Sequence, residues 1–246
     1  MAGHSHWAQI KRKKGANDAK RGKIFSRLAK NITVAAKHGG GDPDGNLKLR
    51  YAIDAARKVN MPKDSIENAI RKGTGVGAAA IDFAELIYGG YGPGGVAILI
   101  EIVTDNRNRT APEIRKLFER RNGKMDDSGS TVHKFEQKGV ISIARSAISE
   151  EDLMNVVLDA GAEDIVSTDP DVWEVRCDPS AYTAVRAALD EKEIEVEDAS
   201  IQRIPMMEVE VNAHDAKVIM GLMEDLEDHD DVNQLFTDAR FPDEME

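Results

Sequence analysis

The sequence predicts an α+β fold: an N-terminal three-helix domain followed by two ferredoxin-like α/β domains, one inserted in the other. Three observations lead to this prediction. Residues 1–80 carry apolar residues at helical spacing, the glycine-rich residues 74–95 interrupt that pattern, and the remaining chain alternates short apolar runs with amphipathic segments. A chain of 246 residues is long enough for this division.

The first predicted helix covers about residues 17–37. Its apolar residues fall within an arc of roughly 100°, while its lysines and arginines cluster on a different arc. One face is therefore expected to be buried and the opposite one to present cations. The glycines and the proline within residues 38–46 end the helix. The apolar positions are Ile24, Phe25, Leu28, Ile32 and Ala35.

Two shorter helices complete the predicted basic helical domain, residues 1–80. The first covers about residues 46–59, and Pro62 blocks its continuation. The second begins at Asp64, where Asp64-Ser65-Ile66-Glu67 has the form of a capping box. Three short amphipathic helices of this kind predict a small bundle.

Residues 74–95 are interpreted as a linker and an entry loop. The run from Tyr88 to Gly95 is rich in glycine, but it precedes a predicted strand, whereas a dinucleotide-binding loop follows a strand and opens a helix. A chain of turns is therefore favoured over a glycine loop that lies close to a ligand.

Beyond this loop, predicted strands alternate with predicted helices. Within residues 137–205 the order is β-α-β-β-α-β, the ferredoxin-like arrangement. We expect this domain to be inserted into another that is built from 81–136 and 206–246. The predicted strands are 96–103, 131–136, 139–145, a hairpin across 164–177, 196–204, 207–211 and 231–236, and the predicted helices are 111–121, 149–160, 180–192 and 213–227.

Charge is segregated along the chain. The net charge is −11, yet residues 1–80 hold 17 Lys/Arg against 6 Asp/Glu, a balance of +11. Residues 146–246 hold 6 against 29, a balance of −23. The segregation suggests separate roles for the two ends, and the alternative is two charged faces that both serve solubility. A cluster at the end of the last long helix is interpreted as a solvated acidic surface: Glu224, Asp225, Glu227, Asp228, Asp230 and Asp231.

Several classes of protein are not expected. Cys177 is the only cysteine, which excludes an intramolecular disulfide and a multi-cysteine zinc site and favours a cytoplasmic location. No apolar run approaches the length of a membrane span. His4 and His6 lack a third ligand nearby, so no metal is expected. No catalytic set has support in the sequence, so neither a cofactor nor a small-molecule substrate is expected.

The strongest chemical signal is a series of cations near the N-terminus. Cations along a flexible arm and one helix face can follow a polyphosphate backbone and release its counterions. The alternative is a solvated basic face, or cations that pair with acidic residues of the α/β body. Trp7 is interpreted either as a stacking platform or as a packed anchor for the arm. The predicted nucleic-acid contacts in this region are Trp7, Lys11, Arg12, Lys13, Lys14, Lys20, Arg21, Lys23, Arg27 and Lys30.

Two further candidate contacts are Arg107 and Arg109, in the polar segment that leaves the predicted strand 96–103. Their guanidinium groups can hold phosphate in a forked geometry. The alternative function of this segment is to cap the next helix through Thr110.

Long stretches of the chain resemble one known family. They read GHSHWAQIKRKKGANDAKRGKIFSRLAKNI, RYAIDAARKVNMPKDSIENAIRKGTG, YGGYGPGGVAILIEIVTDNRNRTAPEIRKLF and FEQKGVI. On these motifs the chain resembles the YebC/PmpR family, which is related to the mitochondrial translational activator of cytochrome c oxidase. The resemblance implies a helical N-terminal domain and two α/β domains. It also implies a DNA-binding transcriptional regulator, and members have been linked to translation at the ribosome.

We therefore expect a regulator that is not an enzyme and that binds DNA through its basic N-terminal helical domain. The alternative is a ribosome-associated translation factor that grips structured RNA by charge and shape. An enzyme with a cleft between the α/β domains is the least favoured interpretation. The expected partners are DNA, RNA or the ribosome, and no membrane.

Overall fold

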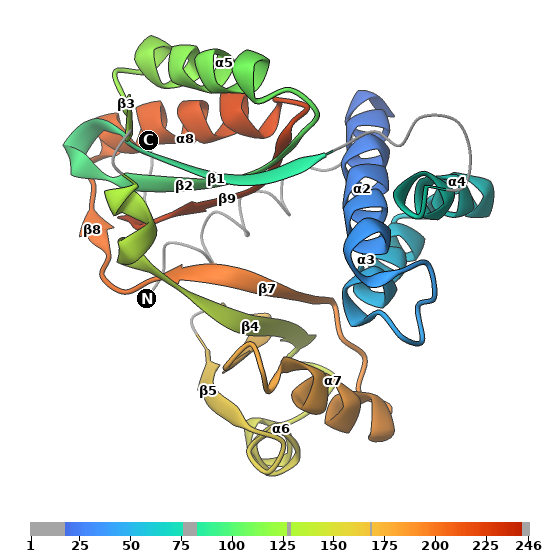
Figure 1. Cartoon of the computed structure of the whole chain (residues 1–246). Coiled ribbons are helices and arrows are strands. Elements are labelled where there is room, and N and C mark those ends of the chain that lie inside the picture. The colour runs from blue at the N-terminus through green and yellow to red at the C-terminus, as the bar shows by residue number, and fades with distance from the viewer. Residues whose placement is uncertain (1–17, 76–82, 127–128, 168, 243–246) are drawn as a thin grey trace.

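The structure is a computed structural model that describes residues 18–75, 83–126, 129–167 and 169–242, with side chains from Gly22 onward. It contains a helical unit followed by two four-stranded antiparallel sheets, each covered by two helices. The predicted α+β class is therefore confirmed. In Figure 1 the two sheets lie one above the other with their helices on the outer sides, and the helical unit stands beside them.

The helical unit consists of α2 (Asp18–Gly39), α3 (Leu47–Lys58) and α4 (Lys63–Gly73). Its three helices share an apolar core in which Ile32 and Leu49 are fully buried. Asn46 ties α2 to α3, because its side chain accepts a hydrogen bond from the backbone N–H of Leu49 and donates one to the carbonyl of Ala35. The unit thus has a core of its own, independent of the sheets.

Two details of the helical unit differ from the prediction. Helix α4 begins at Lys63 with Pro62 as its N-cap and without a side-chain cap, so the capping box at Asp64 is wrong. Asp64 lies instead in the first turn, where its negative charge interacts favourably with the positive end of the helix dipole. Ile24, which the apolar pattern places on the buried face, is 36% exposed.

The first sheet has the strand order β3-β1-β2-β9, and α5 and α8 pack on one of its faces. The chain leaves this sheet after β3 and returns to it with α8 and β9. Ile100 of β2, Phe118 of α5 and Leu222 of α8 are fully buried between them. The elements are β1 (Ala84–Tyr91), β2 (Ala97–Thr104), α5 (Arg107–Arg120), β3 (Lys124–Asp126), α8 (Ala213–Glu227) and β9 (Val232–Thr237).

The sequence predicts a linker and an entry loop over residues 74–95, but part of this segment, Ala84–Tyr91, is strand β1. Gly89 and Gly90 lie inside the strand because there is no room for a side chain at either position. A Cβ on Gly89 would lie 2.5 Å from the Cβ of Thr131, and one on Gly90 would lie 2.4 Å from the ring of Phe118. The glycines therefore serve close packing within a strand. The turn is confined to the residues that follow, including the 3-10 helix Pro93–Gly95.

The second sheet has the order β5-β6-β4-β7, and α6 and α7 cover it. Ile141 and Val175 of the sheet are fully buried against Leu153 of α6 and Leu189 of α7. The elements are β4 (Phe135–Ala144), α6 (Glu150–Val157), β5 (Ala162–Val166), β6 (Val172–Cys177), α7 (Tyr182–Glu191) and β7 (Asp198–Pro205).

Short elements connect the two sheets. The predicted strand at 131–136 is wrong, because Ser130–Lys134 is a 3-10 helix and β4 begins only at Phe135. On the return path, β8 (Val209–Glu210) pairs in parallel with β10 (Ala239–Arg240). No helix within the described ranges has the length and apolar character needed to cross a membrane.

Candidate nucleic-acid interface

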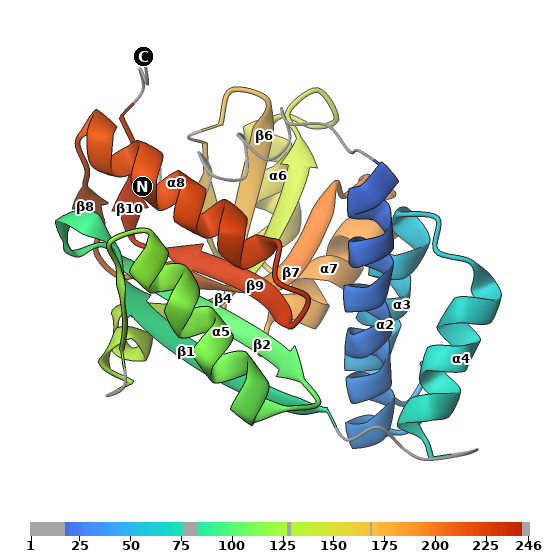
Figure 2. The ribbon, with the colours of Figure 1, turned by 90° about the horizontal axis from the view of Figure 1, so that it is seen from above.

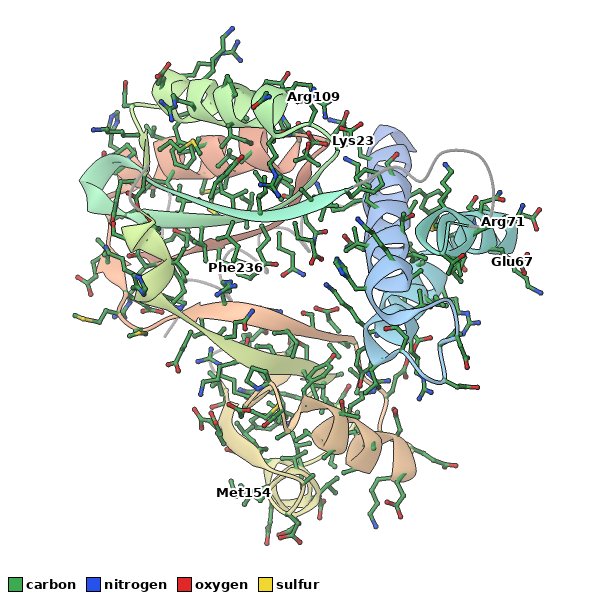
Figure 3. All side chains as sticks on the ribbon, in the orientation of Figure 1. Lys23, Glu67, Arg71, Arg109, Met154 and Phe236 are labelled. Carbon is green, nitrogen blue, oxygen red and sulfur yellow. The ribbon has the colours of Figure 1, made fainter. Side chains whose placement is uncertain are left out.

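The cations of α2 face another part of the chain. Lys23, Arg27 and Lys30, which we name the cationic face, lie against residues 227–231, the acidic turn that joins α8 to β9. Figure 3 shows Lys23 on the side of α2 that faces the first sheet and its helices. The three bonds run from Lys23 Nζ to the carbonyl oxygen of Asp228 (2.9 Å), from Arg27 Nη2 to that of Glu227 (2.8 Å) and from Lys30 Nζ to that of Asp230 (2.8 Å).

The acidic turn attracts these cations for two reasons. The last carbonyl groups of a helix lack an intrahelical partner and carry a partial negative charge. Four of the five residues 227–231 also bear a carboxylate, and Lys23 Nζ lies 3.6 Å from Oδ1 of Asp228. The cationic face therefore supplies the hydrogen bonds that the end of α8 requires.

The three cations differ in exposure. The side chain of Lys23 is 47% exposed, whereas that of Lys30 is 19% exposed. Arg27 is half-buried, and this burial lowers the pKa of its guanidinium, while the nearby carboxylates of the acidic turn act in the opposite direction. An arginine nevertheless keeps its proton in a protein. Arg27 therefore stays charged in this contact.

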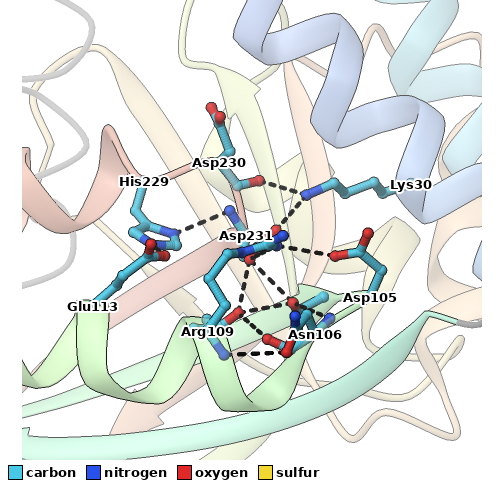
Figure 4. A network of polar contacts seen from close by, with 10 residues as sticks. Lys30, Asp105, Asn106, Arg109, Glu113, His229, Asp230 and Asp231 are labelled. Atoms are coloured by element: carbon cyan, nitrogen blue, oxygen red, sulfur yellow. Dashed lines mark hydrogen bonds and ion pairs between the residues drawn. The ribbon is translucent and has the colours of Figure 1, made fainter.

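Asp231 is the centre of this contact (Figure 4). It is 4% exposed, and its carboxylate accepts from Lys30 Nζ at 2.7 Å and from Arg109 Nη2 at 2.8 Å. The hydroxyls of Thr104 and Thr110 also donate to it, at 3.0 Å and 2.8 Å. Burial acts to raise the pKa of Asp231, but the hydrogen bonds from Lys30, Arg109 and Thr110 outweigh it, so the pKa lies well below its ordinary value.

The interpretation of the acidic cluster as a solvated surface is therefore wrong for Asp231. Its backbone N–H donates to Nδ1 of His229 at 3.1 Å, and Nε2 of His229 lies 3.0 Å from a carboxylate oxygen of Glu113 on α5. These contacts fix the acidic turn against the first sheet. A cation of the helical unit, Lys30, completes the arrangement.

The two arginines that follow β2, Arg107 and Arg109, lie in different environments. Arg109 is engaged, because it donates to Asp105 at 2.9 Å as well as to Asp231. The hydrogen bond to Asp231 is the main cause that raises the pKa of Arg109, and the one to Asp105 adds to it. Arg107 is exposed in the first turn of α5, where it lines an open hollow of about 480 Å³ together with His38 of α2.

Asn106 explains why α5 begins earlier than predicted. Its side chain accepts a hydrogen bond from the backbone N–H of Arg109 at 3.2 Å, which makes it the N-cap. The alternative that Thr110 caps this helix is therefore wrong. Thr110 lies inside the helix and is buried, and its hydroxyl bonds to Asp231.

The helical unit makes a second contact with the α/β part, at the loop between α7 and β7 and at the start of α7. Lys58 Nζ donates to the carbonyl oxygens of Val196 at 3.1 Å and Glu197 at 3.2 Å. The ring of Tyr51 packs edge-on against that of Tyr182, with 5.2 Å between the ring centroids. The helical unit thus contacts each sheet at the loop that precedes an edge strand, before β9 in the first sheet and before β7 in the second.

Both parts of the chain match one known family. Residues 5–76 match the family described as TACO1/YebC protein N-terminal domain. Residues 83–239 match the family described as TACO1/YebC second and third domain. The chain belongs to the TACO1/YebC family.

Relatives in this family match the chain from end to end. A protein of Rubrobacter xylanophilus is 46% identical over 245 residues, which cover 100% of this chain and 98% of the relative. A protein of Desulfotalea psychrophila is 49% identical over 248 residues, with the same coverage. Both are described as probable transcriptional regulatory proteins.

A solved structure supports the fold. The crystal structure of a conserved hypothetical protein, Aq1575, from Aquifex aeolicus is similar with a TM-score of 0.84 and 38% sequence identity. The similarity covers 93% of each chain.

The structure does not describe the side chains of the other predicted contacts of this TACO1/YebC member. Lys20 and Arg21 belong to α2, but their side chains precede the described ones. The others lie outside the described residues: Trp7, Lys11, Arg12, Lys13 and Lys14.

Two exposed cations were not among the predicted contacts of this family member. Arg71 and Lys72 lie in the last turn of α4, and within the described ranges neither takes part in an ion pair. Helix α4 lies on the side of α2 that is away from the sheets (Figure 2). In the sequence these residues only mark a helix end. The available signal for a binding role was their membership of the +11 segment, residues 1–80.

Proposed function

We propose that this chain is a transcriptional regulator that binds the phosphate backbone of duplex DNA with its basic N-terminal helical domain. The charge of residues 1–80 carries the proposal, since 17 Lys/Arg stand against 6 Asp/Glu in a chain of net charge −11. The description of the relatives as probable transcriptional regulatory proteins supports the biological role.

The proposed surface has an exposed part and a covered part. Arg71 and Lys72 are exposed on α4, whereas the cationic face contacts the acidic turn. The arm with Lys11 to Lys14 and Trp7 belongs to the proposed surface as well. Lysines contact phosphate as point charges, and phosphate contacts position a protein without specifying a sequence. Binding is therefore weakly selective among DNA sequences.

Structured RNA is the second candidate ligand. The cations named above are mostly lysines, without the paired Asn, Gln or Arg side chains that read base edges in the major groove. A surface that recognises charge and shape suits an A-form RNA helix as well as a DNA duplex. Action at the ribosome would follow from that preference.

We also propose that the two sheets belong to two ferredoxin-like domains, residues 137–205 and the surrounding 81–136 with 206–246. The element order β4-α6-β5-β6-α7-β7 and the strand order β5-β6-β4-β7 support this assignment for the inserted domain. A cytoplasmic location is part of the proposal, and the single, free Cys177 supports it.

The test is a binding titration of the full-length chain, by fluorescence anisotropy, across a series of KCl concentrations. The ligands are a short labelled DNA duplex and an RNA stem-loop of equal charge. For each cation that contacts duplex DNA and is removed, the slope of log affinity against log salt becomes shallower by about 0.9. We expect this change for Arg71→Ala/Lys72→Ala.

The matched control is Lys192→Ala/Arg240→Ala, which removes two exposed cations from the α/β part. The control should keep the wild-type slope. The proposal is wrong if the chain binds neither ligand at low salt, or if the control loses as much slope as the α4 variant. Tighter binding of the stem-loop than of the duplex would assign RNA as the ligand.

A further inference from the structure

We propose that the acidic turn, residues 227–231, is an internal competitor for the polyanion that the cationic face binds. The chain then has a closed form, in which the acidic turn covers Lys23, Arg27 and Lys30, and an open form, in which these cations are free. The inference deepens the proposed function and rests on it for the identity of the natural polyanion. Closure and release can nevertheless be measured separately from nucleic-acid binding.

The geometry of the acidic turn resembles that of a bound polyanion. Three backbone carbonyl oxygens, of Asp228, Glu227 and Asp230, each accept from one cation at 2.8–2.9 Å. These distances are those of hydrogen bonds that a charged donor strengthens. Phosphate oxygens would make the same bonds with Lys23, Arg27 and Lys30, so the acidic turn and a nucleic-acid backbone compete for the same donors.

The contact can open without separating the core of the helical unit. The apolar residues of α2 in that core, such as Ile32 and Ala35, pack against α3 and α4. Against the acidic turn, α2 offers hydrogen bonds and ion pairs, to which Asn31 adds a bond to Asn233 at 2.8 Å. Water, salt or phosphate can replace such polar partners, so the cost of opening is chiefly electrostatic.

The second contact of the helical unit supplies the pivot. Tyr51 of α3 packs against the apolar core of the second sheet as well as edge-on against Tyr182. That contact loses buried apolar surface if it separates, whereas hydrogen bonds and ion pairs make up the contact at the acidic turn. Opening therefore moves α2 away from the first sheet and breaks the exposed ion pair of Lys48 on α3 with Glu85 on β1, while α3 stays on the second sheet.

Closure reduces the apparent affinity for any polyanion, because only the open fraction binds. The contact can be weakened by Lys→Glu changes on α2 or by Asp→Lys changes in the acidic turn. Only the changes in the acidic turn leave the proposed binding residues intact. Asp228 and Asp230 are suitable because both are exposed and neither belongs to the apolar core. The key variant is therefore Asp228→Lys/Asp230→Lys.

The matched control is Asp159→Lys/Asp164→Lys. It makes the same change in net charge at exposed residues on and before β5, which have no hydrogen bond or ion pair to the described side chains of α2. It measures the gain in affinity that any added positive charge gives. Asp228→Asn/Asp230→Asn is the milder second variant, and circular dichroism checks that each variant is folded.

The distance between the helical unit and the first sheet is measured by energy transfer between dyes on Asn68→Cys and Glu119→Cys, exposed positions on α4 and α5. The native Cys177 is buried, and burial raises the pKa of its thiol, so it stays unlabelled. The added polyanions are inorganic polyphosphate and the labelled DNA duplex.

We expect polyphosphate to lower the transfer efficiency of the wild-type chain. The Asp228→Lys/Asp230→Lys variant should show low transfer without any ligand and should bind the duplex about tenfold more tightly than the control. Unchanged transfer in this variant and with polyphosphate would overturn the inference, as would an affinity equal to that of the control. Release by polyphosphate without binding of DNA or RNA would support the inference and contradict the proposed function.

Discussion

Two contacts of the helical unit with the α/β part involve equivalent loops, but they differ in the packing that accompanies the charges. At the loop after α8, the cationic face meets carbonyl groups and carboxylates. At the loop after α7, Lys58 also donates to carbonyl groups, and Tyr51 of the same helix packs against Tyr182, the first residue of α7. One contact is therefore polar, and the other combines hydrogen bonds with aromatic packing.

This difference shows why a count of cations is a weak guide to their role. Salt and competing anions weaken a contact that depends on charge, whereas they have little effect on buried aromatic surface. Lys58 and Lys30 look alike in the sequence. The structure gives Lys30 a buried carboxylate as partner, Asp231, and gives Lys58 only backbone oxygens.

The largest expected effect is that of Asp231→Ala. This change leaves Lys30, Arg109 and two threonine hydroxyls without their shared acceptor. Removal of one partner from a buried ionic network typically costs about 3 kcal/mol of folding free energy or more. Urea denaturation of the full-length chain measures it.

The control for this prediction is Asp230→Ala. Asp230 is exposed, and its hydrogen bond to Lys30 uses the backbone carbonyl, which the change keeps. Its effect should stay within about 0.5 kcal/mol. Equal effects of the two changes would show that Asp231 does not hold the network together.

The pH dependence of Asp231 gives the second prediction. Its folded pKa lies below the ordinary value, so its charge stabilises the folded chain above the unfolded pKa of about 3.9, and this contribution is lost as the pH falls toward the folded pKa. The difference in stability between wild type and Asp231→Asn should therefore be constant near neutral pH and shrink below about pH 4. A difference that grows on acidification would contradict the assignment.

Helical periodicity predicted much of the fold. It located α2, α3 and α8 to within two residues at either end, because apolar spacing is a local signal, which glycine or proline residues near the ends of α2 and α3 reinforce. It missed β1, since the reason for Gly89 and Gly90 is the space taken by Thr131 and Phe118, which are distant in sequence.

The candidate site was harder to predict for the same reason. The sequence identified Lys23, Arg27 and Lys30 as a cationic group on one helix face. It could not show that this face meets residues about 200 positions further along the chain. Complementary charge in the two ends was the available signal, but charge alone does not give a register between segments.

The third prediction compares cations that are exposed with cations that are covered. Arg71→Ala/Lys72→Ala should leave the denaturation midpoint unchanged and make the salt slope of duplex binding shallower by about 1.8. Lys23→Ala/Arg27→Ala/Lys30→Ala should change both quantities, because it also removes the contact with the acidic turn. If the second variant alters stability but not the salt slope, the cationic face is a structural contact only.

The smallest expected effects concern the second contact and test whether its packing or its hydrogen bonding matters. The hydroxyl of Tyr51 lies 3.4 Å from Oγ1 of Thr183, a long hydrogen bond at an exposed position, so Tyr51→Phe should cost less than about 0.5 kcal/mol. Tyr51→Ala also removes the ring that packs against Tyr182 and should cost about 1.5 kcal/mol or more. Because the lost interaction is apolar, this cost should be the same at low and high KCl when measured by urea denaturation. A cost that disappears at high salt would mean that the second contact is as electrostatic as the first, and α3 could then not serve as the pivot.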